Sequence, residues 1–312
     1  MKQFPDVIVE NEPLSDHTTI RIGGPADLFC EINAIDCLLP VLQELLKLNI
    51  PVVLIGGGSN ILADDRGYRG LVIKFMNQDP PMLEFPLLTV SAGVSLKDIL
   101  EYAAEHSLSG LEFLAGIPGS IGGAVYMNAG AYGKNISDVM HSAVIINENY
   151  TTEAVDTGFF RFSYRTSILQ ETPLTVASVT LKVSRGVKKL IQKEYDRIIG
   201  IREEKHPGPD LPCAGSYFKN LPPENPGEHR RPAGYFLEKA GAKTMSCGGA
   251  AVYKDHANII VNTGGATAAD VLLLAEQMKK AVAESFQITL REEVRFLDAD
   301  HGFSPADSLT EG

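Results

Sequence analysis

The sequence lacks a long apolar run, a C-x-x-C pair and an excess of basic residues. A bilayer-spanning helix needs about 20 consecutive apolar residues, so the first absence excludes a transmembrane helix. The second removes the usual sequence signal of a zinc site or a redox pair. The third is a net charge of −11, from 28 basic and 39 acidic residues, which argues against a nucleic-acid-binding surface.

The start of the chain also lacks the apolar region of a signal peptide. We therefore expect a cytoplasmic protein that binds neither membrane nor nucleic acid and holds no metal. We expect the four cysteines to be reduced and mostly buried; they are Cys30, Cys37, Cys213 and Cys247. The sequence does not determine the oligomeric state, for which a monomer is our expectation.

Proline marks the clearest change of composition along the 312 residues. Seven prolines fall in residues 205–232, as is typical of a boundary between domains. The length suits about two domains. We predict a first region at 1–204 (in subdomains of about 1–76 and 77–204), a second domain at 205–297 and a polar tail at 298–312.

Hydrophobic periodicity predicts a mixture of helices and strands without regular βαβ alternation, which favours the α+β class. The expected helices span about 38–49 (with Pro40 in the first turn), 95–106, 187–204, 233–240 and 268–286. Ser95-Leu-Lys-Asp98 is a capping-box-like start for the second of these, and Thr267-Ala-Ala-Asp270 caps the last. The expected strands lie near 51–55, 71–75, 87–91, 143–146, 174–183, 250–253, 259–261 and 287–297.

Glycine is the residue type whose distribution is most informative. Gly56-Gly57-Gly58-Ser59-Asn60 follows an apolar strand, and glycines there let backbone N–H groups converge on a phosphate. Neither common phosphate motif fits, because no Lys follows and Ile61 occupies the last position of G-x-G-x-x-G. By itself this segment is equally consistent with a phosphate loop and an ordinary glycine turn.

A second glycine-rich segment covers residues 116–133. It contains no charged side chain and mixes glycine with Ile, Val, Met and Tyr, unlike a solvated linker. Its backbone must pack closely against something large. A glycine-lined domain contact is one interpretation, and a planar cofactor with a diphosphate, held between two glycine loops, is the interpretation we favour.

Four polar segments could carry chemistry. Arg165, among small hydroxyls, could clamp a carboxylate, although a surface arginine is the plainer interpretation. Ser216 follows glycine but lacks a G-x-S-x-G elbow, so a hydrolase nucleophile is not indicated. His256 is more typical of a structural histidine than of a base. Residues 291–295, with alternating faces, are typical of a solvated strand edge.

Taken in order, these segments closely resemble the UDP-N-acetylenolpyruvoylglucosamine reductase (MurB) family. Each motif alone is weak, but their order over about residues 8–297 makes the resemblance specific. The matching segments are 14–27, 56–62, 116–123, 127–133, 164–167, 215–220, 256–258, 266–270 and 293–295.

The resemblance implies an FAD-binding fold of the vanillyl-alcohol-oxidase (PCMH) type in two subdomains at 1–204. It also implies a C-terminal α+β substrate-binding domain at 205–297 whose last strand returns to the FAD-binding region. It implies bound FAD, NADPH as co-substrate, and reduction of the enol ether of UDP-N-acetylglucosamine enolpyruvate in peptidoglycan precursor synthesis. The residues that would approach FAD are Gly56, Gly57, Gly58, Ser59, Asn60, Gly119, Ser120, Gly122, Gly123, Asn128, Ala129 and Gly130.

The same resemblance assigns roles around the substrate. Arg165 and Glu293 match the residues that stabilise negative charge on the substrate carboxylate, and Ser216 matches the proton donor. Tyr164, Lys205 and Asn220 match substrate-binding positions. We add Lys219 from its place near Ser216, as a cation for the substrate diphosphate and as an aid to proton transfer.

Two segments depart from the family pattern. Residues 220–231 are longer and more polar than the usual link, and 244–247 replace a glycine-containing turn. No insertion matches the mobile tyrosine-bearing loop of the longer family branch, so we expect the shorter branch. The alternatives are another FAD-dependent oxidase of this fold, or a non-catalytic flavin- or nucleotide-binding module. The combination of Tyr164, Arg165, Ser216 and Glu293 argues against both.

Overall fold

The computed structural model describes residues 8–77 and 79–305. The chain forms two compact units from interleaved segments. Unit 1 takes Met1–Ile8, Phe29–Gly57 and Val72–Arg202, and unit 2 takes Val9–Leu28, Gly58–Leu71 and Glu203–Gly312. The domain boundaries predicted from the sequence stay a prediction.

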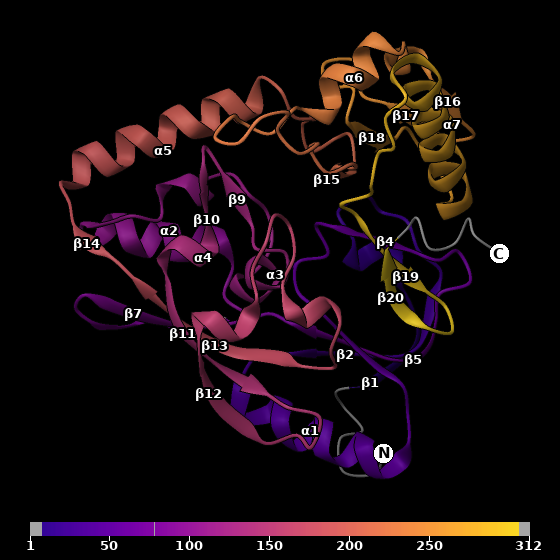
Figure 1. Ribbon diagram of the computed structural model, residues 1–312. Helices are drawn as coiled ribbons and strands as arrows, with labels where there is room; N and C mark the ends of the chain where they lie inside the picture. The colour runs from indigo at the N-terminus through magenta and orange to yellow at the C-terminus, as the bar shows by residue number, and fades with distance from the viewer. Residues whose placement is uncertain (1–7, 78, 306–312) are drawn as a thin grey trace. The chain divides into compact units, whose positions relative to one another are not determined.

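The main sheet of unit 1 has five antiparallel strands in the order β12-β11-β13-β7-β6 (Figure 1). Apolar residues alternate along β13, whose buried positions face the unit's core. The short helix α3 packs on β13 and β7 and carries the second glycine segment to this sheet. The strands are β6 (Met82–Glu84), β7 (Leu87–Ser91), β11 (Met140–Ile146), β12 (Thr152–Asp156) and β13 (Thr175–Lys182), and α3 is Ile121–Tyr126.

The remaining elements of unit 1 are helices and short strands. The predicted cap of α2 is confirmed, because the Ser95 hydroxyl accepts the N–H of Asp98 at 3.0 Å. These elements are α1 (Ile35–Leu48), β3 (Val52–Ile55), α2 (Leu96–Glu105), β8 (Leu108–Ser109), β9 (Gly130–Ala131), β10 (Lys134–Asn135), α4 (Ile136–Val139), β14 (Ser184–Arg185) and α5 (Lys188–Glu203).

Helix α1 begins at Ile35, three residues before the predicted start. Pro40 therefore lies inside the helix and not in its first turn. Proline has no N–H to donate, so the carbonyl of Asp36 loses the helical bond it would otherwise accept.

Unit 2 contains a four-stranded antiparallel sheet in the order β15-β18-β17-β16, with helices α6 and α7 side by side next to it (Figure 1). Its core joins the buried face of α7, which includes Val271, Leu274 and Met278, to Tyr217 and Phe218. The elements are β15 (Cys213–Ser216), α6 (Ala233–Lys239), β16 (Ser246–Cys247), β17 (Ala250–Val252), β18 (Ile259–Asn262) and α7 (Ala268–Phe286).

A second sheet of unit 2 contains the last strands of the chain. β19 (Arg295–Asp298) runs parallel to β4 (Ile61–Ala63) and antiparallel to β20 (Gly302–Pro305). The predicted strand at 287–297 is thus wrong for 287–294, where Glu292 makes only an isolated bridge to Phe218. Part of the predicted polar tail is the strand β20, and residues 306–312 lie outside the described residues. β1 (Ile8–Pro13), β2 (Pro25–Ile32) and β5 (Tyr68–Phe75) complete the strands.

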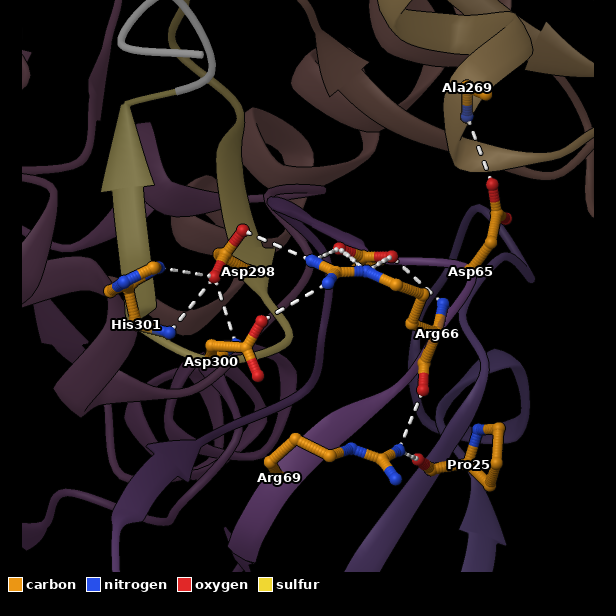
Figure 2. A network of polar contacts seen from close by, with 9 residues as sticks. Pro25, Asp65, Arg66, Arg69, Ala269, Asp298, Asp300 and His301 are labelled. Atoms are coloured by element: carbon orange, nitrogen blue, oxygen red, sulfur yellow. Dashed lines mark hydrogen bonds and ion pairs between the residues drawn. The ribbon is translucent and has the colours of Figure 1, made fainter. Parts of the chain in front are cut away.

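Polar contacts connect the turn after β4 to the turn between β19 and β20 (Figure 2). The Arg66 guanidinium lies 2.8 Å from Asp64 and 3.1 Å from Asp300. Asp298 accepts the backbone N–H groups of Asp300 and His301, both at 2.9 Å. These contacts hold two turns that are more than 200 residues apart in sequence.

Asp65 points the other way, to the start of α7 (Figure 2). Its carboxylate accepts the N–H groups of Ala268 at 2.7 Å and Ala269 at 3.1 Å. Thr267 and Asp270 add the capping box that the sequence predicts. The mixed helices and antiparallel sheets confirm the α+β class. Within the described parts of the chain, no helix has the length and apolar character needed to span a bilayer.

Candidate active site

The two glycine segments meet in unit 1. A Cβ placed on Gly57 would lie 3.1 Å from the Cα of Gly119, and one on Gly56 would overlap the Ser120 hydroxyl. Ser120 is itself occupied in capping α3, because its hydroxyl accepts the N–H of Gly123 at 3.3 Å. Close packing between the segments therefore accounts for part of their glycine content.

The second segment also leaves backbone uncovered by side chains. Gly119 and Gly122 are half-buried and Gly123 is exposed. Backbone without a neighbouring Cβ lets another group approach closely. The N–H groups of Gly122 and Gly123 donate within the protein, to the Ala92 carbonyl at 2.8 Å and to the Ser120 hydroxyl at 3.3 Å, so what these glycines offer is room. The residues present therefore fit the close approach of a large group, such as the FAD that we expect.

Gly58, Ser59 and Asn60 belong to unit 2. The Gly58 carbonyl accepts the N–H of Thr19 at 3.1 Å, and a Cβ at this position, where φ is +64°, would overlap the His17 carbonyl. The Asn60 side chain donates to the backbone carbonyl of Glu293 at 3.0 Å, and the backbone carbonyl of Asn60 accepts the N–H of Arg295 at 3.0 Å. Asn60, predicted to approach FAD, thus holds the backbone of a candidate catalytic residue.

Arg165 lies in unit 1 on a tight turn closed by two backbone bonds between Ser163 and Thr166, of 3.1 and 3.2 Å. Its φ of +55° is in the left-handed region, which costs a residue with a Cβ roughly 1–2 kcal/mol. The guanidinium donates to the Gly130 carbonyl at 2.7 Å and lies 5.1 Å from the centroid of the Tyr164 ring. These contacts hold a strained arginine in one place.

The 128–130 segment that we expect near FAD therefore also positions Arg165. Asn128 also holds the turn that carries Arg165, because its side chain donates to the Ser163 carbonyl at 2.9 Å. Ala129 lies between them, with its carbonyl accepting the N–H of Ile136.

Sequence reasoning missed Arg202, at the end of unit 1. Its guanidinium Nε donates to the Gly116 carbonyl at 2.9 Å. Burial lowers the pKa of Arg202, and the charge of Arg165 lowers it further, whereas Tyr132 opposes the shift. In sequence Arg202 is one of several charges on a long helix, so nothing there distinguishes it from a solvated residue.

Ser216 ends β15 in unit 2, directly after a bulge. Cys213 pairs with Val261 and Ser216 with Ile259, so the ladder shifts register between them, at the point where Gly215 has a φ of +76°. A bulge of this kind bends a strand and changes the direction of the next side chain. The half-buried Ser216 therefore has a direction set by Gly215.

The segment after Ser216 lies beside the segment that contains Glu293. The Tyr217 carbonyl accepts the N–H of Glu293 at 2.7 Å, and the Lys219 N–H donates to the Arg291 carbonyl at 2.8 Å. Unit 2 thus brings Ser216, Lys219 and Glu293 onto two directly bonded segments.

The interpretation of residues 291–295 as a solvated strand edge is wrong. The Glu292 side chain is 2% exposed and lies 3.1 Å from the Lys279 ammonium, and Arg295 is 9% exposed. Strict strand alternation, which places Glu293 and Arg295 on one face, does not hold because 291–294 is outside the strand.

The candidate substrate residues are spread over both units. Asn220, in unit 2, accepts the N–H of Ala233 through its side chain at 3.1 Å. Lys205 is exposed in unit 2, and Tyr164 is half-buried in unit 1. The long segment 220–231 closes on itself, because Leu221 bridges Arg231 and Arg230 donates to the Asn220 carbonyl at 2.9 Å.

His256 and the cysteines have structural surroundings. The His256 Nδ1 atom accepts the N–H of Asn258 at 3.2 Å, and burial lowers the pKa of His256. Burial raises the pKa of Cys30 to about 11 and also raises that of Cys213. Cys37 is exposed and Cys213 and Cys247 are half-buried, so the expectation that the cysteines are mostly buried is wrong. Across residues 8–77 and 79–305, no group of three or more His, Cys, Asp or Glu residues is arranged to hold a metal ion.

Comparison with known proteins accounts for both parts of this arrangement. The model of an FAD binding domain matches residues 27–153, which include every residue that we expect near FAD. The model of the UDP-N-acetylenolpyruvoylglucosamine reductase C-terminal domain matches residues 206–297, which include Ser216, Lys219, Asn220 and Glu293.

Relatives match almost the whole chain. UDP-N-acetylenolpyruvoylglucosamine reductases from Anoxybacillus flavithermus and Bacillus subtilis are 41% and 39% identical over 292 residues, which is 93% of this chain and 94% of each relative. The crystal structure of UDP-N-acetylenolpyruvylglucosamine reductase (MurB) from Thermus caldophilus is similar with a TM-score of 0.75 at 30% identity, covering 93% of this chain and 97% of that one. These matches confirm two predictions, FAD as the cofactor and the FAD-binding fold. The chain therefore belongs to the UDP-N-acetylenolpyruvoylglucosamine reductase family of FAD-containing oxidoreductases.

Proposed function

We propose that this chain reduces the enolpyruvyl ether of UDP-N-acetylglucosamine enolpyruvate to the lactyl ether of UDP-N-acetylmuramate, in peptidoglycan precursor synthesis. NADPH is the reductant of the first half-reaction. The family supports this substrate class, and two segments of unit 2 support it chemically. The observation that carries the proposal is the direct backbone bond from Glu293 to Tyr217, which keeps an acid next to the Ser216 segment.

The glycine segments 56–60 and 116–130 would hold FAD. When bound and reduced by NADPH, FAD supplies the hydride that adds to the vinyl carbon distal to the ether oxygen. The protein contributes orientation and electrostatics around that transfer.

Ser216 would complete the reduction with a proton. Hydride addition leaves negative charge on the carbon that bears the carboxylate, and the Ser216 hydroxyl donates its proton to that carbon. A hydroxyl is a weak acid, so it serves only against so strong a base and with help from neighbours. Lys219, three residues away, is the cation that we assign to assist it.

Arg165 and Glu293 would stabilise the enolate-like charge on the substrate carboxylate. Arg165 is always cationic and can bind a carboxylate with two parallel bonds. Glu293 must be protonated to donate a hydrogen bond there. Groups fixed before the reaction stabilise charge with little reorganisation, which agrees with the constrained turn that carries Arg165.

The substrate's diphosphate needs cations that an acidic protein must supply locally. Lys205 and Lys219 are the cations that we assign to it, and Tyr164 and Asn220 are the polar partners of the sugar nucleotide. This assignment follows the family motifs and the positions of the residues in the sequence.

Replacing Ser216 tests the proposal. In Ser216→Ala, NADPH should reduce the flavin at the wild-type rate, whereas reoxidation by the enolpyruvyl substrate should slow by about 100-fold or more, the scale of a lost general acid. Stopped-flow absorbance of each half-reaction measures this separately. Ser246→Ala, at an exposed serine of the same unit, is the control. Fast reoxidation in Ser216→Ala would remove Ser216 from the mechanism.

Three finer points stay predictions of the sequence: the shorter family branch, a cytoplasmic location and a monomer. Light scattering of the purified holoenzyme tests the last of these. A dimer would show that the monomer prediction is wrong without affecting the reaction.

A further inference from the structure

Asn258 extends the pairing between β15 and β18 beyond the ends of both strands. The last strand pair is Ser216 with Ile259. One residue further on, the Asn258 carbonyl accepts the N–H of Tyr217 at 2.7 Å. The regular ladder ends there, because Ala257 and Asn258 lie in the turn that precedes β18.

The Asn258 side chain then takes the place of a strand. Its Oδ1 accepts the N–H of Phe218 at 2.9 Å, and its Nδ2 donates to the carbonyl of the same residue at 2.8 Å. The backbone donor and acceptor of Phe218 determine which way the amide points. Asn258 is 2% exposed, so water cannot replace either bond without a rearrangement.

The opposite edge of the same short segment is bonded to the candidate acid. Tyr217 accepts the N–H of Glu293, and Lys219 donates to Arg291. Asn258 thus lies on one side of residues 216–219 and Glu293 on the other. A displacement of Phe218 would move both the end that carries Ser216 and the segment that carries Glu293.

We infer that Asn258 is a positioning residue for the proton donor Ser216 and for Glu293, acting through the backbone of Tyr217 and Phe218. The inference rests on the proposed function of Ser216. In this role Asn258 acts on the backbone of Tyr217 and Phe218 and not directly on substrate or cofactor. Misplacement of a reacting group by about 1 Å can slow a reaction about 100-fold. Side-chain bonds that fix the backbone beside Ser216 can therefore affect the rate of proton transfer.

Asn258→Asp is the sharpest test because it changes one donor into an acceptor without changing shape. The neutral acid can still donate to the Phe218 carbonyl, whereas the carboxylate faces that carbonyl with like charge. Reoxidation of the reduced flavin by the enolpyruvyl substrate should be near the wild-type rate at low pH. It should fall about 10-fold to 100-fold relative to wild type as pH rises, while reduction by NADPH stays unchanged.

Asn262→Asp is a matched control at the other end of β18. Asn262 is also buried, and its amide also bonds backbone on both sides, donating to Ile20 and accepting from Gly264 and Ala266. It does not contact residues 216–219 among the described contacts. Other ionisable groups around His256 and the segment 217–219 are common to all variants and cancel in the comparison with wild type. They are Lys205, His206, Lys219, Glu238, Lys243, His256, Arg291, Glu292 and Glu293.

A pH profile of Asn258→Asp that parallels wild type or Asn262→Asp would overturn the inference, as would equal slowing of both half-reactions. If Asn258→Asp does not fold, Asn258→Ala carries the test: it keeps the backbone bond to Tyr217 and should slow only reoxidation, by about 10-fold or more. Equal rates in wild type and Asn258→Ala would also overturn it. Failure of the proposed function would be distinct, since wild type itself would then not be reoxidised by the substrate.

Discussion

The candidate catalytic residues depend on backbone geometry that lies outside their motifs. Arg165 is held by carbonyls of the glycine segment, and Ser216 by a bulge at Gly215. The motifs identify both residues by type and order. Arg202, which donates to the Gly116 carbonyl, and Asn258, which bonds the backbone of Phe218, come from tertiary placement. Neither has a local pattern that distinguishes it from an ordinary charged or buried residue.

Gly57 gives a prediction at this scale. A methyl group at residue 57 would lie 3.1 Å from the backbone of Gly119, so Gly57→Ala must push the glycine segments apart. Overpacking of this kind costs about 1–3 kcal/mol, and we expect FAD to bind at least about 10-fold more weakly. Fluorescence titration of the apoprotein with FAD measures the affinity.

Gly200→Ala is the control for that substitution. Gly200 lies on α5, and a Cβ there meets no atom within 4 Å. Alanine should stabilise the helix by about 0.5–1 kcal/mol and leave FAD affinity as it is. Unchanged affinity in Gly57→Ala would contradict the contact between the two segments.

Elements with strong local signals were predicted well, and elements defined by distant partners were not. The caps of α2 and α7 are confirmed because hydroxyl and carboxylate side chains bond backbone within the same turn. The strand predicted at 287–297 is mostly irregular, because residues 291–293 bond the segment 217–219 and not a sheet neighbour. Alternation of side chains does not reveal which partner a segment has.

Helix α7 gives a prediction at the element scale. Asp65 accepts two N–H groups in its first turn (Figure 2). Asp65→Ala leaves these donors without the carboxylate, and loss of a helix cap costs about 0.5–2 kcal/mol. We expect the free energy of unfolding to fall by that amount in urea titrations.

Asp210→Ala, at an exposed acidic residue of the same unit, should change stability by less than about 0.5 kcal/mol. It removes one negative charge, as Asp65→Ala does. Equal stability of the two variants would show that the capping by Asp65 contributes nothing measurable.

At the scale of the whole molecule, the sequence predicted the α+β class, the FAD-binding fold and the family. Beyond the expected return of the last strand, it did not predict that two compact units would draw on interleaved segments. That interleaving follows from long-range pairing, such as β4 with β19, which composition does not encode. The net charge of −11 likewise describes the surface as a whole and leaves the local cations to be found individually.

The stability of the protein should depend on pH through His256. Burial lowers the pKa of His256 in the folded state. Between the folded and the unfolded pKa, His256 is therefore protonated in the unfolded chain and neutral in the folded chain. Stability is then full above the ordinary histidine pKa of about 6.5 and is lost as pH falls through that value towards the folded pKa.

His256→Asn should flatten this dependence, because its side-chain oxygen can accept the same N–H without titrating. The check is the thermal midpoint of both proteins between about pH 5 and 7.5, around the ordinary histidine pKa. The wild-type midpoint should fall more steeply on acidification. Parallel curves would show that His256 does not contribute to the pH dependence.

The most direct test of the central claim is an anaerobic titration of the purified protein followed by its visible spectrum. The protein should be yellow, NADPH should bleach the flavin, and UDP-N-acetylglucosamine enolpyruvate, but not UDP-N-acetylglucosamine, should restore the colour. A colourless protein that does not bind added FAD would contradict this account. A bleached flavin that only oxygen reoxidises would contradict it as well.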